Sequence, residues 1–388
     1  MNNKAFISAA IVFLLCLLIG FWMAQHKPIW NDEFYTAVSS VDARSYADQF
    51  LGHIPEGNNT PLFYALQKSL CQMIHYHIPA VWKTGQWDSN RQAQIILRVI
   101  PVLCMSLSIA LIFFYFARGY SLGWAIYSLF VFLSSYMAWA YWAEARPYPL
   151  IVLLTTVQSL FFLKIVNQPK GETQGWKSLA VVHLLLAFTF IFSIGQIVAA
   201  SLMLWVKQQR SWKKYLFWTV LPVGIALFYY SHAPRYPFYF GLSPEQLIRD
   251  NFSRERFYIL FVFIVLAAAY WLGVKRSWKS FFINQEIKSS ITFVFFTVLT
   301  LLATAGVLGL FMLHQCQPGT GFPITSRYFI YLTPIGVIAA TVMTRSIIHS
   351  LSGYRWLQWI MIGAIAVWVI PRFFKIVPKA IHSILGGQ

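Results

Sequence analysis

The sequence predicts an all-α, polytopic integral membrane protein with about eleven transmembrane helices. Of its 388 residues, 58% are hydrophobic and only 11% are charged, whereas about a quarter of the residues in a soluble domain are charged. Apolar runs of about 20 residues, the length that crosses the core of a bilayer, recur along the chain. The 16 Trp and 20 Tyr residues are typical of the aromatic belts at membrane–water boundaries.

The formal net charge of +18 at pH 7 does not indicate a nucleic-acid-binding protein. The basic residues form no single patch or arm, and instead they occupy the gaps between apolar runs. That distribution is typical of topology signals and of contacts with anionic lipid phosphates. We therefore expect membrane lipids, and no nucleic acid, among the partners of this chain.

Residues 5–24 form the first apolar run, and Lys4 is the only charged residue before it. A cleaved signal peptide is one interpretation, because Ala24 ends the run with a small residue. We predict an uncleaved first helix instead, because about 20 apolar residues are long enough to span a bilayer.

A long segment, residues 25–94, separates this run from the next and contains half of the 12 acidic residues. It includes one weaker apolar stretch, residues 61–78, which Gln, Lys and His side chains interrupt. We predict that this stretch is an interfacial helix, lying in the membrane surface rather than crossing it. The whole segment is predicted to be the first outer loop.

The later apolar runs predict the remaining spans, and the boundary between two of them is a tight break at residues 193–196. No further region is long and polar enough to be an appended soluble domain, so residues 1–388 are predicted to form a single transmembrane domain. The predicted spans are residues 95–117, 122–142, 149–166, 178–193, 194–206, 216–231, 257–274, 291–313, 328–343 and 357–376.

The basic residues also predict the orientation. Half of the 30 Lys and Arg residues fall in short segments on the same side as the N-terminus, where Glu172 and Glu286 are the acids. Lys and Arg in short loops favour the cytoplasmic side, so we expect the N-terminus inside and residues 25–94 outside.

The four cysteines form no recognisable framework. Cys16 and Cys104 lie within apolar runs, whereas Cys71 and Cys316 lie in predicted outer segments. A disulfide between Cys71 and Cys316 stays open, because two cysteines without known geometry do not establish a bridge.

Residues that are unusual in a membrane protein gather on the predicted outer side. The segment 28–35 directly follows the first helix and contains adjacent carboxylates, Asp32 and Glu33, beside Trp30. An ordinary structural explanation is that Asn31 or Asp32 caps a short helix that has an acid in its first turn. The functional interpretation is that one carboxylate accepts a proton during catalysis.

Three arginines accompany this acidic pair. Arg146 follows Glu144 at the outer junction of two spans, Arg327 enters a later span from outside, and Arg98 lies one turn inside the second span. An aromatic belt and snorkelling would explain the first two in purely structural terms. Arg98 needs a partner, because an unpaired charge within a membrane is costly.

Together these residues resemble the motifs of the GT-C glycosyltransferases, polytopic enzymes that use a polyprenyl-phosphate sugar as donor. The resemblance is to the branch that contains protein O-mannosyltransferases and the aminoarabinose transferase of lipid A. It covers roughly the whole chain, is densest before Leu150, and departs from the family in having Thr60 for a Pro and no large outer domain. The matching positions are Asp32-Glu33, Thr60-Pro61-Leu62-Phe63-Tyr64, Arg98, residues 143–148 and Ser326-Arg327-Tyr328.

The resemblance implies transfer of a sugar from a polyprenyl-phosphate donor to an acceptor hydroxyl, with inversion at the anomeric carbon. It implies Asp32 as the general base and Glu33 as a helper that binds acceptor, sugar or a metal. Arg146 and Arg327 would clamp the donor phosphate, and Arg98 would support an outer-loop acid. Further donor contacts are expected from Tyr64 and Tyr148.

The expected acceptor is a lipid-linked glycan or another hydroxyl compound, since no added outer domain is available to recognise a folded protein. The sequence requires no cofactor, but a divalent metal stays open, with Glu33, His53 and His314 as weak candidate ligands. The resemblance implies a multi-pass protein of the bacterial inner (plasma) membrane with its active site on the outer face.

Two other classes of protein are alternatives. A transporter or flippase of a lipid-linked anionic substrate would use the same basic residues without a reaction, but its charges would lie near the bilayer midplane. A membrane acyltransferase would need a His in or near the membrane with an acid or Asn partner. His183 lies at the inner end of a span without such a partner in the sequence.

Overall fold

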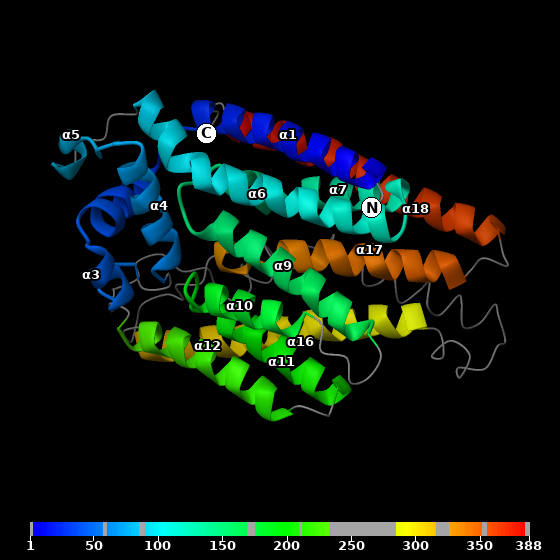
Figure 1. Cartoon of the computed structure of the whole chain (residues 1–388). Helices are drawn as coiled ribbons and strands as arrows, with labels where there is room; N and C mark the ends of the chain where they lie inside the picture. Colours follow the sequence, from blue (N-terminus) through cyan, green and yellow to red (C-terminus); the bar gives the residue numbers. More distant parts are fainter. Residues whose placement is uncertain are drawn as a thin grey trace.

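The computed structural model describes residues 3–56, 60–84, 90–168, 175–208, 212–232, 285–315, 326–350 and 355–384. All regular secondary structure in these ranges is helical, which confirms the predicted all-α class for this part of the chain. Long helices lie roughly parallel in one bundle, and a group of short helices gathers at one end of it (Figure 1).

The length and apolar composition of several helices are those of a membrane protein. Within the described ranges, five helices are long and apolar enough to cross a bilayer, and three shorter apolar helices accompany them. The five are α1 (Asn3–His26), α6 (Arg91–Gly119), α9 (Tyr148–Val166), α16 (Gln285–Gln315) and α17 (Leu332–Ser350). The three shorter ones are α7 (Leu122–Leu133), α10 (Trp176–Ala187) and α11 (Ser193–Gln208), and two further helices are α12 (Trp212–His232) and α18 (Arg355–Ile384). The predicted span 257–274 lies outside the described residues.

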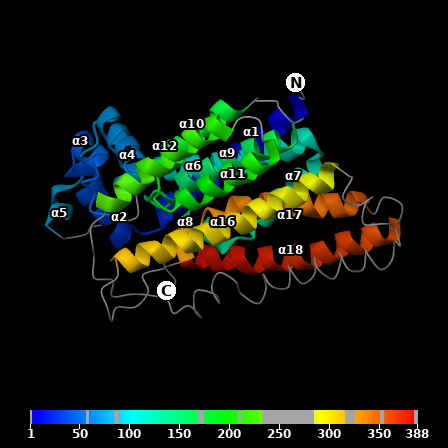
Figure 2. The same ribbon diagram turned by 90° about the horizontal axis from the view of Figure 1, so that it is seen from below.

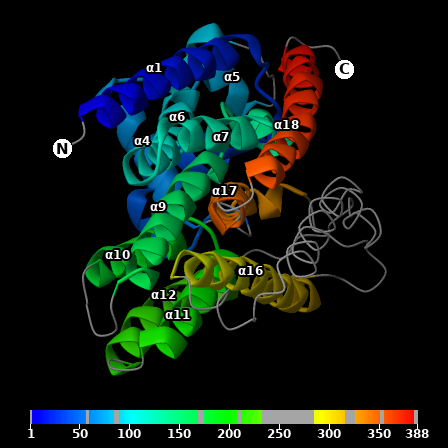
Figure 3. The same ribbon diagram turned by 90° about the vertical axis from the view of Figure 1, so that its right-hand side faces the viewer.

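The helices form layers when the bundle is viewed from its end (Figure 3). Helices α1, α6 and α7 lie on one side and α10, α11, α12 and α16 on the other, with α9 and α17 between them. Helices α16 and α17 run side by side along much of their length (Figure 2). A large hydrophobic core, rich in Phe, Ile and Val, connects these layers.

Helix α1 packs tightly along α6. A Cβ atom added at Gly20 would lie 2.6 Å from Cγ1 of Val102 and 2.9 Å from the indole nitrogen of Trp142. The side chains of Met23 and Ala24 are fully buried. Helix α1 is therefore packed against the rest of the bundle near its C-terminal end.

The expectation of one continuous helix over residues 122–142 is wrong. The chain forms α7, breaks at Ser134 and Ser135, and resumes as α8 (Tyr136–Tyr141). Ser134 Oγ donates to the carbonyl of Val131 at 2.8 Å, and the indole N–H of Trp139 donates to the carbonyl of Leu133 at 2.7 Å. These side chains satisfy carbonyls that a continuing helix would have used, so ending the helix here costs little.

The break predicted at residues 193–196 lies several residues too late, because α10 already ends at Ala187. The carbonyls of Phe188 and Thr189, just beyond this end, accept hydrogen bonds from the backbone N–H groups of Leu62 (2.7 Å) and Thr60 (3.4 Å). A distant segment therefore satisfies the freed carbonyls, which a local sequence pattern does not reveal.

The short helices between α1 and α6 correspond to the predicted first outer loop. They are α2 (Asn31–Tyr35), the π-helical turn η1 (Thr36–Asp42), α3 (Tyr46–Phe50), α4 (Leu62–Met73) and α5 (Ala80–Lys83). Helix α4 occupies the stretch predicted as an interfacial helix, although it ends earlier. Cys71 on α4 is a buried free thiol, and its suggested partner Cys316 lies outside the described residues.

Candidate functional site

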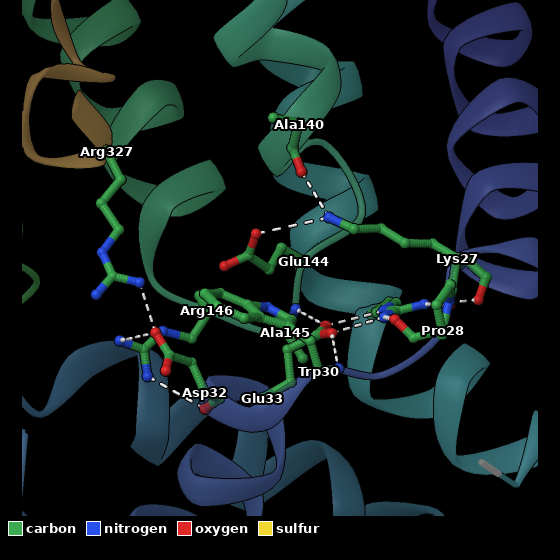
Figure 4. A network of polar contacts seen from close by, with 12 residues as sticks. Lys27, Pro28, Trp30, Asp32, Glu33, Ala140, Glu144, Ala145, Arg146 and Arg327 are labelled. Carbon is green, nitrogen blue, oxygen red and sulfur yellow. Dashed lines mark hydrogen bonds and ion pairs between the residues drawn. The ribbon is translucent and has the colours of Figure 1, made fainter. Parts of the chain in front are cut away.

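Charged side chains from distant parts of the chain meet at the end of the bundle that carries the short helices (Figure 4). They come from the end of α1, from α2, from the start of α6, from the turn between α8 and α9, and from the 3-10 helix η2 (Ser326–Phe329). Their ion pairs differ in burial, and this difference separates supporting residues from accessible ones.

Glu33 and Arg98 form the innermost pair, and both side chains are fully buried. Arg98 donates from Nη2 to Oε2 of Glu33 at 2.6 Å and from Nε to Oε1 at 2.9 Å. The backbone N–H groups of Ala145 and Trp30 also donate to this carboxylate, at 2.6 and 3.2 Å. Burial raises the pKa of Glu33, but the Arg98 guanidinium, with smaller effects of Lys27 and the Ala145 N–H, offsets this and holds the pKa below its ordinary value. Glu33 is therefore ionised, and hydrogen bonds occupy both of its carboxylate oxygens.

The remaining contacts of Arg98 close the end of α1. Its Nη1 donates to the carbonyls of Ala24 (3.0 Å) and Lys27, and its Nη2 donates to the carbonyl of Pro28 at 2.9 Å. The last carbonyls of a helix have no partner within the helix, and Arg98 supplies donors for them. The structure therefore places Arg98 as the partner of an outer-loop acid and as a clamp joining α1, α2 and α6.

Arg146 and Glu56 form a second buried pair, with side-chain exposures of 6% and 5%. Arg146 Nη1 contacts Oε2 of Glu56 and donates to Oγ1 of Thr36 at 2.7 Å. Oε1 of Glu56 accepts from the hydroxyls of Thr36 (2.7 Å) and Ser40 (3.0 Å). Burial lowers the pKa of Arg146, but Glu56, together with Tyr148, Tyr64 and Asp32, raises it by more, so the net pKa lies well above the ordinary value. Arg146 is a fixed, charged and largely compensated group.

Asp32 and Arg327 form the outermost pair, in which Arg327 Nη1 lies 2.5 Å from Oδ2 of Asp32. The two side chains keep exposures of 30% and 22%. Arg146 approaches the same oxygen, with Nη2 at 3.9 Å, and its Nη1 donates to the backbone carbonyl of Asp32 at 3.2 Å. Oδ2 is thus held by two guanidinium groups, whereas Oδ1 has no such contact among the described residues. This carboxylate can accept a further hydrogen bond.

Lys27 and Glu144 lie beside these pairs (Figure 4). Lys27 Nζ donates to the carbonyl of Ala140 at 2.6 Å and lies 3.6 Å from Oε2 of Glu144. Oε1 of Glu144 is buried and has no hydrogen-bond partner among the described residues. Burial raises the pKa of Glu144 to about 7, against the opposing effect of the Lys27 ammonium. Glu144 is therefore a carboxyl group that changes its protonation near neutral pH.

The two tyrosines expected to contact the donor line the buried side of the site. Both Tyr64 and Tyr148 are fully buried, and the Tyr148 ring centroid lies 5.8 Å from the guanidinium carbon of Arg146. Both phenols are among the groups that raise the pKa of Arg146. In this arrangement they support Arg146 rather than face solvent.

The site is balanced in formal charge. Four basic groups meet four acids, and the pairs run from fully buried to partly exposed. The basic groups are Lys27, Arg98, Arg146 and Arg327, and the acids are Asp32, Glu33, Glu56 and Glu144. An anion that reaches the exposed pair would meet a preorganised set of donors in a setting of low dielectric constant.

No group of three or more His, Cys, Asp or Glu side chains is placed so that it could hold a metal ion in the part of the chain that the structure describes. The suggested metal ligands do not converge here. Glu33 is occupied by Arg98, and His53 lies 3.6 Å from Asp48. The side chain of His314 is not among those described.

The sequence pointed to Asp32, Glu33, Arg98, Arg146 and Arg327, and the structure brings these five residues together. The sequence did not single out Glu56 and Lys27, which neutralise two of the site charges. Glu56 is one of six acids in a long loop, and nothing in its neighbourhood distinguishes it. The only available signal was that a buried arginine needs an acid.

No protein-family model matches the chain, and no curated protein matches it either. The geometry of the site and the motif resemblance are therefore the two indications of its function.

Proposed function

We propose that this chain is a membrane glycosyltransferase that moves a sugar from a polyprenyl-phosphate donor to an acceptor hydroxyl on the outer face of the membrane. The observation that carries the proposal is the partly exposed pair of Asp32 and Arg327, which two buried ion pairs hold in position. Such a pair offers a base and an anion-binding group within one hydrogen-bond distance of each other. A buried polyprenyl chain would reach it from the surrounding bilayer.

In the proposed reaction, Oδ1 of Asp32 accepts the proton of the acceptor hydroxyl. The hydroxyl oxygen forms a bond to the anomeric carbon, and the bond from that carbon to the phosphate oxygen breaks. The electron pair of the broken bond stays on the phosphate, whose negative charge grows. Arg327 stabilises that charge, with Arg146 behind it, and its planar guanidinium suits a phosphate.

In this proposal Glu33 does not bind acceptor, sugar or a metal, the role that the motif resemblance implied for it. Each of its oxygens already accepts two hydrogen bonds, so it has little capacity for acceptor, sugar or metal. We assign to Glu33 the positioning of α2, which fixes the direction of the Asp32 side chain. Arg98 serves the same purpose from α6.

The decisive experiment uses the purified chain in liposomes with a radiolabelled polyprenyl-phosphate sugar and a lipid-linked glycan acceptor. A transferase produces labelled acceptor and an equal amount of free polyprenyl phosphate. A flippase moves the donor across the bilayer and leaves the sugar–phosphate bond intact. Translocation without cleavage, across a panel of donor sugars and acceptors, would replace the proposal with the transporter alternative.

A further inference from the structure

A cavity of about 220 Å³ lies at the opposite end of the bundle from the charged site. It is formed where the α6–α7 connection, the end of α9, the start of α16 and the end of α17 meet, at the end of the bundle drawn on the right of Figure 1. Helix α9 alone separates the two ends by about 28 Å, because its 19 residues rise about 1.5 Å each. The cavity cannot belong to the Asp32 site. Its lining residues are Tyr120, Leu163, Asn167, Ser289, Val342, Arg345 and Ser346.

Two groups of the polar lining of this cavity can donate hydrogen bonds to an anion, the guanidinium of Arg345 and the amide nitrogen of Asn167. The guanidinium carbon of Arg345 lies 4.0 Å from the centre of the Tyr120 ring, which holds the planar group in a fixed orientation. Ser289 and Ser346 are buried hydroxyls, and Asn167 adds an amide. None of the described lining residues is acidic.

Neighbouring hydrogen bonds hold these donors in place. Ser289 Oγ donates to Oδ1 of Asn167, which leaves the amide nitrogen of Asn167 as a donor. The hydroxyls of Ser346 and Ser290 lie 2.5 Å apart. The contacts join α9 to α16 and α16 to α17, so the cavity is part of the packed bundle and not a gap between loose loops.

The surroundings of the cavity favour an anion that belongs to a lipid. Arg118, Lys164 and Lys288 are exposed near the same ends of α6, α9 and α16. Helix α7 begins directly beyond Tyr120, and its Leu122 and Ile126 expose 52% and 42% of their surface. A headgroup phosphate in the cavity would leave its acyl chains against this apolar face. Basic pockets between transmembrane helices commonly bind phosphate headgroups in this way.

The size of the cavity agrees with such a group. Its volume of about 220 Å³ is enough for several water molecules. That space accommodates a phosphate and a small substituent, but not a lipid tail as well. We propose that this cavity is a binding site for the phosphate headgroup of an anionic phospholipid, in the leaflet opposite the Asp32 site, with Arg345 as its principal ligand.

The test measures lipid binding by the full-length chain with native mass spectrometry, adding phosphatidylglycerol, phosphatidylcholine or inorganic phosphate. We expect phosphatidylglycerol to bind wild type more tightly than phosphatidylcholine. Arg345→Gln should weaken that binding by roughly ten- to a hundred-fold, the scale of a lost charged hydrogen bond. Arg345→Lys keeps the charge but loses the planar fork, so its affinity for phosphatidylglycerol should lie between those of wild type and Arg345→Gln. This variant also tests the site if the Gln variant does not fold.

Arg118→Gln is the matched control, because Arg118 is an exposed arginine at the same end that does not line the cavity. It should leave phosphatidylglycerol binding nearly unchanged. Equal losses in the Arg118 and Arg345 variants would overturn the proposal in favour of general surface attraction. If inorganic phosphate bound as tightly as phosphatidylglycerol, the site would be one for free phosphate, and the proposal of a lipid headgroup would be wrong. Neither result depends on sugar transfer.

Discussion

Asp32 and Arg327 are 295 positions apart in the chain, yet Nη1 of Arg327 lies 2.5 Å from Oδ2 of Asp32. The pair remains partly exposed, whereas its neighbours Glu33–Arg98 and Glu56–Arg146 are buried. The exposed pair is supported from beneath by the buried ones. In the proposed function, the outer pair carries out the chemistry and the inner two pairs position it.

Asp32→Asn should abolish sugar transfer while donor binding and folding persist. Asn has nearly the same size and still hydrogen-bonds, but it does not accept a proton at neutral pH. We expect the transfer rate to fall by about two to four orders of magnitude, the usual cost of a missing general base. The measurement is the initial rate with labelled donor in liposomes.

Asp42→Asn is the control for this substitution, because Asp42 lies in the same loop and pairs with Lys83 at the surface. Its transfer rate should stay near that of wild type, since exposed ion pairs contribute little. A wild-type rate in Asp32→Asn would remove Asp32 from the role of base.

Glu33→Gln should reduce stability more than it changes the chemistry. The substitution leaves the Arg98 guanidinium buried without its counter-charge, a change that typically costs about 3–5 kcal/mol. We expect a lower thermal unfolding midpoint in detergent and less folded protein in the membrane than for Asp32→Asn. A Glu33→Gln protein with normal stability and no transfer would instead place Glu33 in the catalytic step.

Arg327→Lys should slow transfer while the yield of folded protein is maintained. A lysine keeps the positive charge but loses the planar fork that matches a phosphate. If Asp32 and Arg327 act in one step, combining Arg327→Lys with Asp32→Asn should slow transfer by less than the product of the two single effects. Fully multiplicative effects in this double-mutant cycle would show that the residues serve separate steps.

Glu144 should make the stability of the protein depend on pH. Burial raises the pKa of Glu144 to about 7 from an ordinary value of 4.5, so the folded protein holds this proton more tightly than the unfolded chain. The resulting stabilisation is complete below about pH 4.5 and is lost as the pH rises through about 7. We expect the free energy of unfolding to be larger at pH 5 than at pH 8, with a contribution from this group on the order of 1–3 kcal/mol. The measurement is the thermal unfolding midpoint, which should be higher at pH 5.

Glu144→Gln isolates this contribution, because every other titratable group is common to both proteins. The variant should show a smaller change between pH 5 and pH 8 than wild type. An identical pH dependence in the two proteins would mean that Glu144 is already ionised at neutral pH.

The sequence predicted the all-helical class and the approximate positions of most described helices, because long apolar runs in a bilayer satisfy their backbone groups as helices. It was less successful at helix ends. The break at Ser134 and the early end of α10 at Ala187 depend on hydrogen bonds with side chains and with a distant segment. Such partners are absent from any local pattern.

The sequence by itself also determined which residues could form the site, because charged side chains in an apolar protein must pair or face water. Only the tertiary structure decided how they pair. Asp32 and Glu33 are adjacent, but successive residues on a helix point about 100° apart, so Glu33 meets Arg98 on α6 whereas Asp32 meets Arg327 on η2. Those partners lie 65 and 295 positions away, and the folding of the bundle alone brings them within hydrogen-bond distance.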